Sequence, residues 1–296
     1  MSIIPLYVNR GLKDDERRTR IFGGALFLYS APAESTRIVE WVRECVADAF
    51  AATGDVRRAH QKLGVEEFAK IASSLKSRFT NDTRTKKLCQ DLIAAMGCDP
   101  ERTYFDLPRL RVAPPGEYLT TGVSYAYKPH RDPWYAHPTQ LINYWVPVYD
   151  SEPSTVMSMF IDYFHRPVLN ASGEWDYDEW VKNARYAAAQ NIGVETRRHP
   201  VPTQSLGDTV DVRIVQNAGD LMLFSTCQLH ATAPNLTDCI RYSYDLRTLH
   251  IDDLLEGRGP QNIDGKATGS TLKDFLRLSD LAPLELAQDG RPVSRP

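Results

Sequence analysis

The chain has 296 residues, of which 42% are hydrophobic and 25% charged, and its formal net charge is -3. This length and composition are those of a globular protein that can bury a sizeable core without disulfides. The slight negative charge offers no basic excess for a phosphate backbone or an anionic lipid surface. We therefore expect neither nucleic acid nor a membrane as a partner, and leave the oligomeric state open.

The five cysteines are sparse and form no C-x-x-C pair. This usage is typical of reduced thiols in a cytosolic protein, and most of them should be small buried hydrophobes. The apolar run at the N-terminus is short and interrupted by Pro5, unlike a signal sequence. No stretch approaches the ~20 apolar residues of a membrane helix. A cytoplasmic location is the default expectation.

Helical periodicity dominates the first hundred residues. In 34–52, Val39, Val42, Val46 and Phe50 recur at helical spacing, and Gly54 can end the helix. Two more stretches, 62–76 and 83–96, have the same character. Residues 1–100 are therefore expected to be mainly helical.

Short runs rich in aromatic and β-branched residues follow, which is typical of strands. The expected strands are 109–112, 118–127, 139–149, 156–160, 209–216, 221–225 and 241–249. Between them, about 162–205 is a polar insertion with helix-compatible residues near 175–190, and such an excursion could cover a site. After Asp253 the chain becomes a tail (251–296) with one further helix expected at 272–281.

This order predicts an α+β protein with a single domain over 1–296. Its core would be a β-sandwich or barrel at about 101–250, interrupted by the insertion.

The sequence KPHRDPWYAHP carries a metal-ligand pattern. His130 and Asp132 are two residues apart, so on a strand both side chains would point to one face. An imidazole and a carboxylate suit iron(II), and a second imidazole would complete a facial triad with open coordination positions. His230, after the apolar run GDLMLFS, is the candidate third ligand.

A second pattern lies downstream, in CIRYSYDLR. Arg241 and Ser243 share a face on a strand, in the same way as His130 and Asp132. A guanidinium beside a hydroxyl is a suitable site for the distal carboxylate of an oxoacid that chelates iron through its other end.

Together, His130-x-Asp132, His230 and Arg241-x-Ser243 resemble the signature of the Fe(II)/2-oxoglutarate-dependent oxygenase superfamily over roughly residues 104–250. The phytanoyl-CoA-hydroxylase-like branch is the nearest in appearance. The resemblance implies a double-stranded β-helix (jelly-roll, cupin-like) core. It also implies Fe(II) as cofactor with 2-oxoglutarate and O2 as co-substrates, and hydroxylation of a polar small molecule with release of succinate and CO2.

Other outcomes remain open on the sequence alone. The same site could desaturate, epoxidise, cyclise or epimerise. A cupin-type hydrolase or isomerase could use the same three ligands with zinc or manganese, and a non-catalytic binding protein could share the fold. Halogenation is disfavoured because a carboxylate is present at Asp132, where related halogenases have a small residue.

Further site candidates surround the motif. Gln140 and Asn143 have opposite parity on the expected strand, so at most one should contact 2-oxoglutarate; Asn143 is preferred. The expected substrate-pocket residues are Tyr127, Trp134, Tyr135 and Arg247, in keeping with a cyclic, polar substrate. His137 is a weak alternative ligand, and His60 and His199 are expected at the surface.

Overall fold

The computed structural model describes residues 3–185, 187–287 and 292. Four helices occur in the first hundred residues: α1 (Asp14–Phe22), α2 (Ala33–Ala49), α3 (Val65–Asn81) and α4 (Thr83–Ala95). The expected helices at 34–52, 62–76 and 83–96 are confirmed as α2, α3 and α4, with shifted ends. Gly54 and Gly97, which follow two of them, both have positive φ, as the chain reversals there require.

A mixed sheet forms the centre of the molecule. Its path is β1-β2-β7-β5-β9-β3-β10, and β4 also pairs with β9. The bounds are β1 Leu6–Val8, β2 Leu26–Tyr29, β3 Thr103–Asp106, β4 Arg109–Ala113, β5 Ile142–Pro147, β7 Leu221–Ser225, β9 Arg241–His250 and β10 Phe275–Arg277.

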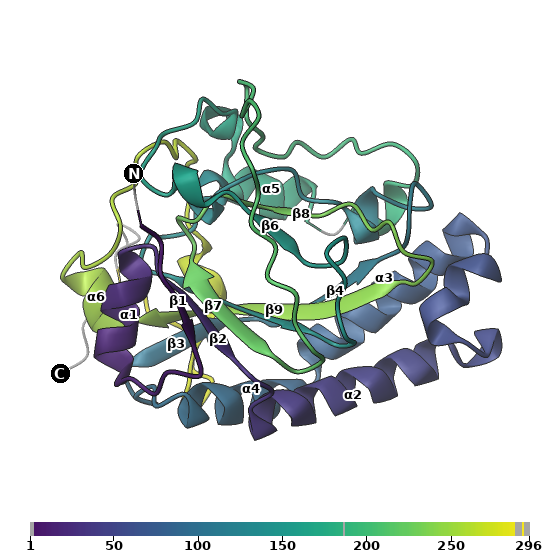
Figure 1. The fold of residues 1–296 in the computed structure, drawn as a ribbon, viewed down its shortest axis with the longest axis horizontal. Coiled ribbons are helices and arrows are strands. Elements are labelled where there is room, and N and C mark those ends of the chain that lie inside the picture. Colours follow the sequence, from purple (N-terminus) through teal and green to yellow (C-terminus); the bar gives the residue numbers. More distant parts are fainter. Residues whose placement is uncertain (1–2, 186, 288–291, 293–296) are drawn as a thin grey trace.

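A second, two-stranded sheet pairs β6 (Met157–Met159) with β8 (His230–Thr232). In Figure 1 it lies on one side of the large sheet, and α2 and α4 lie on the other. The helices and the sheet face toward them share the largest apolar cluster, which includes Phe27, Tyr144 and Leu246. A smaller cluster with Trp145, Met159 and Phe224 fills part of the space between the two sheets.

Strand alternation explains how the large sheet divides its side chains. On β9, Tyr242, Tyr244 and Leu246 join the apolar cluster shared with the helices. The alternate residues of this strand are Arg241, Ser243, Asp245 and Arg247. Their side chains therefore point to the opposite face of the large sheet, toward the small sheet. A buried row of charged and polar side chains on a core strand costs free energy unless partners are provided.

Several strand expectations are confirmed: 109–112 is β4, 139–149 contains β5, 156–160 contains β6, 221–225 is β7 and 241–249 lies within β9. The expectation that the first hundred residues are mainly helical missed β1 and β2, which join the large sheet. The tail likewise contributes β10, and its expected helix at 272–281 is wrong. There the chain forms a single 3-10 turn, Thr271–Asp274, before β10 pairs with β3.

The expected strand at 118–127 is also wrong. This segment makes a 3-10 turn at Gly122–Ser124, and Gly122 has a φ of 56°. A Cβ on Gly122 would lie 2.3 Å from the Ala188 carbonyl oxygen and 2.4 Å from that of Asn191. The segment therefore packs against the insertion and does not pair with a neighbouring strand. At 209–216 only Val212 makes a strand-like bridge, to Met159.

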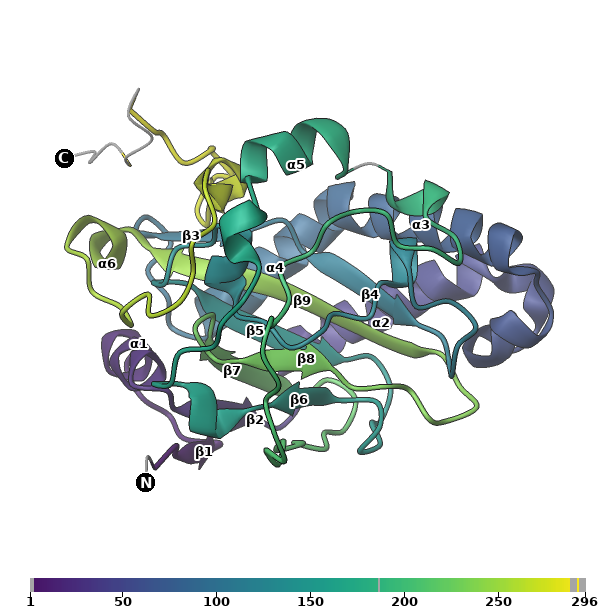
Figure 2. The same cartoon turned by 90° about the horizontal axis from the view of Figure 1, so that it is seen from above.

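The insertion carries one short helix, α5 (Tyr177–Asn183), within the stretch expected to be helix-compatible. In Figure 2, the insertion passes over the face of the large sheet that carries the small one. Among the described helices, none is both long and apolar enough to cross a membrane. All five cysteines are buried and unpaired, and the expectation of buried thiols is confirmed.

Candidate metal and co-substrate site

His130 and His230 face each other across a backbone bridge. Each residue's N–H donates to the carbonyl oxygen of the other, at 2.9 Å in both directions. Residues paired in this way project their side chains to the same side. The two imidazole rings consequently lie side by side, with ring centres 4.4 Å apart. Two distant segments of the sequence thus bring their histidines together through main-chain pairing.

The backbone also fixes which ring nitrogen is available. Nδ1 of His130 is 2.8 Å from the Lys128 carbonyl oxygen, and Nδ1 of His230 is 2.8 Å from that of Gln228. A carbonyl only accepts, so both Nδ1 atoms carry the proton and both Nε2 atoms are free to bind a metal. Burial, with the neighbouring His230, lowers the pKa of His130 to about 3, and burial also lowers the pKa of His230. Both rings are therefore neutral at pH 7.

Asp132 completes the group. The candidate ligand atoms of His130, Asp132 and His230 all lie within 4.8 Å of one another, and all three residues are buried. The strand-parity argument for His130 and Asp132 is nevertheless wrong, because Asp132 begins a 3-10 turn that runs to Tyr135. The carboxylate reaches the imidazoles because the turn directs it back toward them.

The Asp132 carboxylate is held from two strands of the large sheet. Asn143 Nδ2 on β5 donates to Oδ2 at 2.7 Å, and Arg247 on β9 donates to both oxygens, at 3.2 and 3.1 Å. Burial would raise the pKa of Asp132, but the charge of Arg247 more than offsets it and keeps that pKa well below its usual range. Asp132 is consequently an anion in the interior.

Arg247, which was expected in the substrate pocket, lies between two carboxylates. Its guanidinium lies between Asp132 and Asp106, with ion-pair distances of 3.1 Å to each. Asp106 also accepts the Arg247 backbone N–H. Arg247 therefore supports the carboxylate of a candidate metal ligand; it also lines the cavity beside these ligands, and its contact with a substrate stays a prediction.

Trp134, also expected in the substrate pocket, does not line the cavity beside the candidate ligands. It is fully buried, and its indole N–H donates to Asp264 at 2.7 Å. Arg131, between the two motif ligands, is also 3.0 Å from Asp264 and donates to carbonyl oxygens of the insertion. Trp134 and Arg131 thus anchor the back of the motif, away from the ligands.

A cavity of about 450 Å³ opens in front of the three candidate ligands. Tyr127 and Tyr135 line it, as expected, and lie next to His130, with ring centres 5.3 and 5.2 Å from that imidazole. The insertion contributes Trp175, Trp180 and His199 to the wall. This finding supports the expectation that the insertion covers the site.

Arg241 and Ser243 are brought to this cavity region by β9. Nε of Arg241 and Oγ of Ser243 are buried and have no hydrogen-bond partner among the described residues. Burial and the nearby Arg111 lower the pKa of Arg241 to about 10, although Asp245 opposes this effect. An unpaired interior cation beside an unpaired hydroxyl fits a ligand carboxylate. The two residues therefore match the donor set expected for the distal end of an oxoacid.

Of the two remaining candidates, His137 lines the cavity and Gln140 does not. Gln140 is not among the cavity-lining residues; its side chain lies against Gly259, within 3.3 Å of where a Cβ would be. This position agrees with the preference for Asn143, which does line the cavity, and a co-substrate contact of either residue stays a prediction. His137 lines the cavity but lies outside the three-residue group, and its Nδ1 is 2.8 Å from the Thr271 hydroxyl.

Sequence reasoning assigned His199 to the surface, and this is wrong. Its side chain is only 4% exposed and stacks on Tyr125, with ring centres 3.9 Å apart. Both ring nitrogens lack a hydrogen-bond partner in the described part of the chain. Burial and Arg197 lower its pKa to about 4 against the opposing charge of Glu195, so the ring is neutral.

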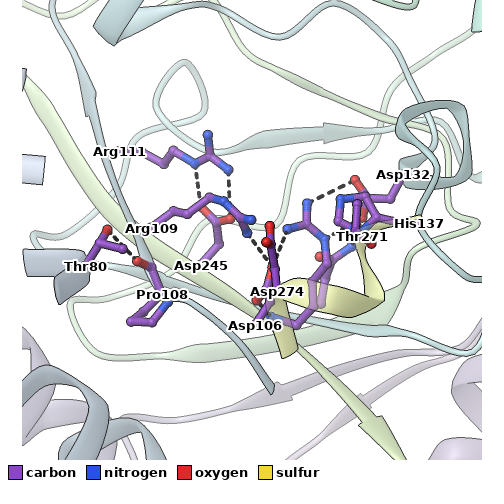
Figure 3. Close-up of polar contacts among 12 residues, drawn as sticks. Thr80, Asp106, Pro108, Arg109, Arg111, Asp132, His137, Asp245, Thr271 and Asp274 are labelled. Carbon is purple, nitrogen blue, oxygen red and sulfur yellow. Dashed lines mark hydrogen bonds and ion pairs between the residues drawn. The ribbon is translucent and has the colours of Figure 1, made fainter. Parts of the chain in front are cut away.

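The sequence analysis also missed a row of cationic side chains along β4. Arg111 forms a two-point ion pair with Asp245, and Arg109 pairs with Asp106 (Figure 3). Both lie on the cavity side of a strand whose alternate residues, Leu110 and Val112, are buried in the core. Charged residues alternating with core residues on an interior strand were the available signal.

No protein-family model and no curated protein matches the chain. Solved structures do resemble it. EvdO2 from Micromonospora carbonacea var. aurantiaca, complexed with 2-oxoglutarate, is 16% identical over 82% of this chain and 93% of its own, with a TM-score of 0.46. The non-heme α-ketoglutarate-dependent epimerase SnoN from nogalamycin biosynthesis is 13% identical over 90% and 100%, with a TM-score of 0.40. The non-heme monooxygenase ThoJ is 14% identical over 73% and 70%, also with a TM-score of 0.40.

At these identities and TM-scores, the likeness carries no argument about function. The chemistry of this chain has to be inferred from its own side chains.

Proposed function

We propose that this protein is an Fe(II)- and 2-oxoglutarate-dependent oxygenase that hydroxylates a C–H bond of a polar small molecule. The observation that carries the proposal is the combination of two features in one cavity region. His130, Asp132 and His230 present two neutral imidazoles and a carboxylate within 4.8 Å of one another. Nearby, Arg241 and Ser243 present buried donors that have no partner in the described part of the chain.

The ligand set suits ferrous iron. Two imidazoles and one carboxylate on one side of an ion leave positions open for a bidentate oxoacid and for oxygen. Iron with 2-oxoglutarate and O2 supplies the oxidising power: one oxygen atom enters the substrate as a hydroxyl, the other enters succinate, and CO2 leaves. The neutral Nε2 atoms and the ionised Asp132 are in the protonation states that metal binding requires.

In this proposal Arg241 and Ser243 hold the distal carboxylate of 2-oxoglutarate. A bound dicarboxylate would give the guanidinium a counter-charge and the hydroxyl a hydrogen-bond acceptor. A metal-dependent hydrolase or isomerase with the same three ligands would have no use for this pair. The pair is therefore the feature that favours an oxygenase.

The proposal extends to the fold. The large and small sheets enclose the site between them, and we interpret them as the two sheets of a jelly-roll, or double-stranded β-helix, core. Placement near the phytanoyl-CoA-hydroxylase-like branch rests on the sequence motif.

Calorimetry tests the proposal without knowledge of the substrate. We expect Mn²⁺, a redox-stable substitute for Fe²⁺, to bind once per chain, and 2-oxoglutarate to bind the Mn²⁺-loaded protein far more tightly than the metal-free protein. His230→Ala should abolish both effects. Arg241→Met should retain Mn²⁺ but lose 2-oxoglutarate. Retention of 2-oxoglutarate affinity in Arg241→Met would contradict the role given to Arg241.

A further inference from the structure

The cavity is unusually rich in cations, and most of them are neutralised. Among its described lining residues, seven are cationic, and five of these pair with carboxylates. The pairs join Arg109 to Asp106, Arg111 to Asp245, Arg185 to Asp274, Arg197 to Glu195, and Arg247 to both Asp106 and Asp132. Two lining cations have no carboxylate at ion-pair distance within the described residues: Arg241 and Lys76.

Arg241 has an assigned ligand if the proposed function is correct, but Lys76 has none. An iron(II) ion and a 2-oxoglutarate dianion add equal and opposite charge, so their binding leaves the second cation uncompensated. A partly buried ammonium group without a carboxylate partner is costly, and a ligand can supply the missing charge.

Lys76 is well placed to meet such a ligand. It lies on α3 and reaches the cavity, where its ammonium group donates to the Val123 carbonyl oxygen. The charges around it come from three other elements: Arg109 and Arg111 on β4, Asp245 on β9, and Arg197 in the insertion. Three of these four neighbours are cations, and each of the three pairs with a carboxylate, so within the described residues Lys76 is the cation at this end of the cavity, the cationic end, that lacks a carboxylate partner.

The cationic end adjoins the aromatic wall and the candidate metal ligands. The Arg111 guanidinium carbon lies 5.2 Å from the centre of the Tyr127 ring, and that ring centre is 5.3 Å from the His130 imidazole. Arg111 and the metal ligand His130 thus both adjoin one tyrosine ring. Beside them, Trp175, Trp180 and His199 carry buried ring nitrogens that have no hydrogen-bond partner among the residues the structure describes.

We propose that the substrate is a cyclic molecule that carries an anionic group, a carboxylate or a phosphate, and that Lys76 binds this group beside Arg111 and Arg197. The ring packs along Tyr127 and Tyr125, and its polar substituents accept from or donate to the indole and imidazole nitrogens of the insertion. This inference rests on the proposed function, because it treats the cavity as the place where a substrate meets the metal.

Burial and the neighbouring arginines lower the pKa of Lys76 to about 7, although Asp245 opposes this effect. At neutral pH, this group is therefore poised between its charged and neutral forms. An anion bound beside it would favour the charged form.

Three probes with the same ring test the charge requirement: 4-nitrophenyl phosphate, 4-nitrobenzoate and the neutral 4-nitrobenzyl alcohol. Each is titrated calorimetrically into protein loaded with Mn²⁺ and saturated with 2-oxoglutarate, so that Arg241 is already occupied. We expect at least one anionic probe to bind more than tenfold more tightly than the alcohol. The tighter of the two identifies the group as phosphate or carboxylate.

The variants Lys76→Met and Lys76→Arg then test whether Lys76 is responsible for the tighter binding of the anionic probe. Lys76→Met keeps the aliphatic stem and should weaken the anionic probe about tenfold or more, whereas Lys76→Arg should stay within about threefold of wild type. Lys70→Met is the matched control, because Lys70 is an exposed lysine on the same helix. Unchanged 2-oxoglutarate affinity in Lys76→Met would establish that the variant is folded.

Two results overturn the inference: anionic probes that bind no better than the alcohol, or equal binding of the anionic probe by Lys76→Met and wild type. Either result leaves the proposed function intact if 2-oxoglutarate still requires Arg241. Conversely, if wild type fails to bind 2-oxoglutarate, the proposed function fails, and Lys76-dependent binding of anionic probes without 2-oxoglutarate would still support an anion subsite.

Discussion

The guanidinium of Arg247 donates two hydrogen bonds to the carboxylate of Asp132, with Nε 3.2 Å from one oxygen and Nη2 3.1 Å from the other. The pair joins a loop turn to the central strand of the large sheet. It fixes the orientation of the one anionic ligand in the candidate metal site. Residues that orient metal ligands in this way often matter nearly as much as the ligands themselves.

Replacement of Asn143 by alanine should weaken metal binding, because Asn143 donates to the same carboxylate at 2.7 Å. We expect a 10- to 100-fold loss of Mn²⁺ affinity, in the range typical for residues that support metal ligands. Calorimetric titration measures it. Gln140→Ala is the control, since Gln140 lies on the neighbouring segment but outside the cavity. Equal losses in the two variants would refute the support role.

Replacement of Arg247 by methionine should destabilise the fold. It would leave Asp106 and Asp132 buried with less opposing charge, which typically costs about 3–5 kcal/mol in the free energy of unfolding. Urea denaturation of the metal-free protein measures this loss. In the control Arg258→Met, the pair with Asp253 is half exposed on its arginine side, so the loss should stay below about 1 kcal/mol. Similar losses of unfolding free energy in the two variants would contradict the idea that the buried ion pairs of Arg247 stabilise the fold.

Replacement of Arg241 by leucine should have opposite effects on stability and on binding. The ligand-free protein should unfold at a temperature about 2 °C or more above wild type, because an unpaired interior cation is removed. Its affinity for 2-oxoglutarate should fall on the order of a hundredfold, since charge-assisted hydrogen bonds are lost. Differential scanning fluorimetry and calorimetry report the two quantities. A variant that is less stable and still binds 2-oxoglutarate would show that Arg241 is structural.

Binding of 4-nitrobenzoate should weaken as the pH rises through about 7. The pKa of Lys76 in the free protein is lowered to about 7, so the group is an ammonium below this pH, and above it the neutral amine must take up a proton from solvent when the anion binds. Affinity should be constant below about pH 6 and fall by up to about tenfold per pH unit above 7. Lys76→Arg should give a flat profile over the same range. A falling profile that persists in Lys76→Arg would assign the titration to another group.

The sequence predicted the parts of the site whose signals are local. His130, Asp132 and His230 stood out by residue type, and Arg241-x-Ser243 by its spacing on a clear strand. The reason given for His130 and Asp132 was still incorrect, because the chain leaves the extended conformation at Asp132. The true organising contact is the backbone bridge between His130 and His230, and residues 100 positions apart give no local sign of pairing.

The rest depended on tertiary contacts. Arg247 was expected in the substrate pocket and His199 at the surface, because sequence alone does not reveal which carboxylates or rings will surround them. Strands β1, β2 and β10 are short and were missed for the same reason: pairing with an existing sheet stabilises them more than their own residue preferences do. At Gly122 the chain makes a turn that packs closely against the insertion, where a strand was expected.

The most direct test of the central claim is an anaerobic titration of the Fe²⁺-loaded protein with 2-oxoglutarate, followed by visible absorption spectroscopy. Chelation of ferrous iron by the keto and carboxylate groups produces a charge-transfer band. The account predicts that the band saturates at one 2-oxoglutarate per chain, is absent in His230→Ala, and requires much higher 2-oxoglutarate in Arg241→Met. A wild-type protein that binds iron but develops no band at saturating 2-oxoglutarate would contradict it.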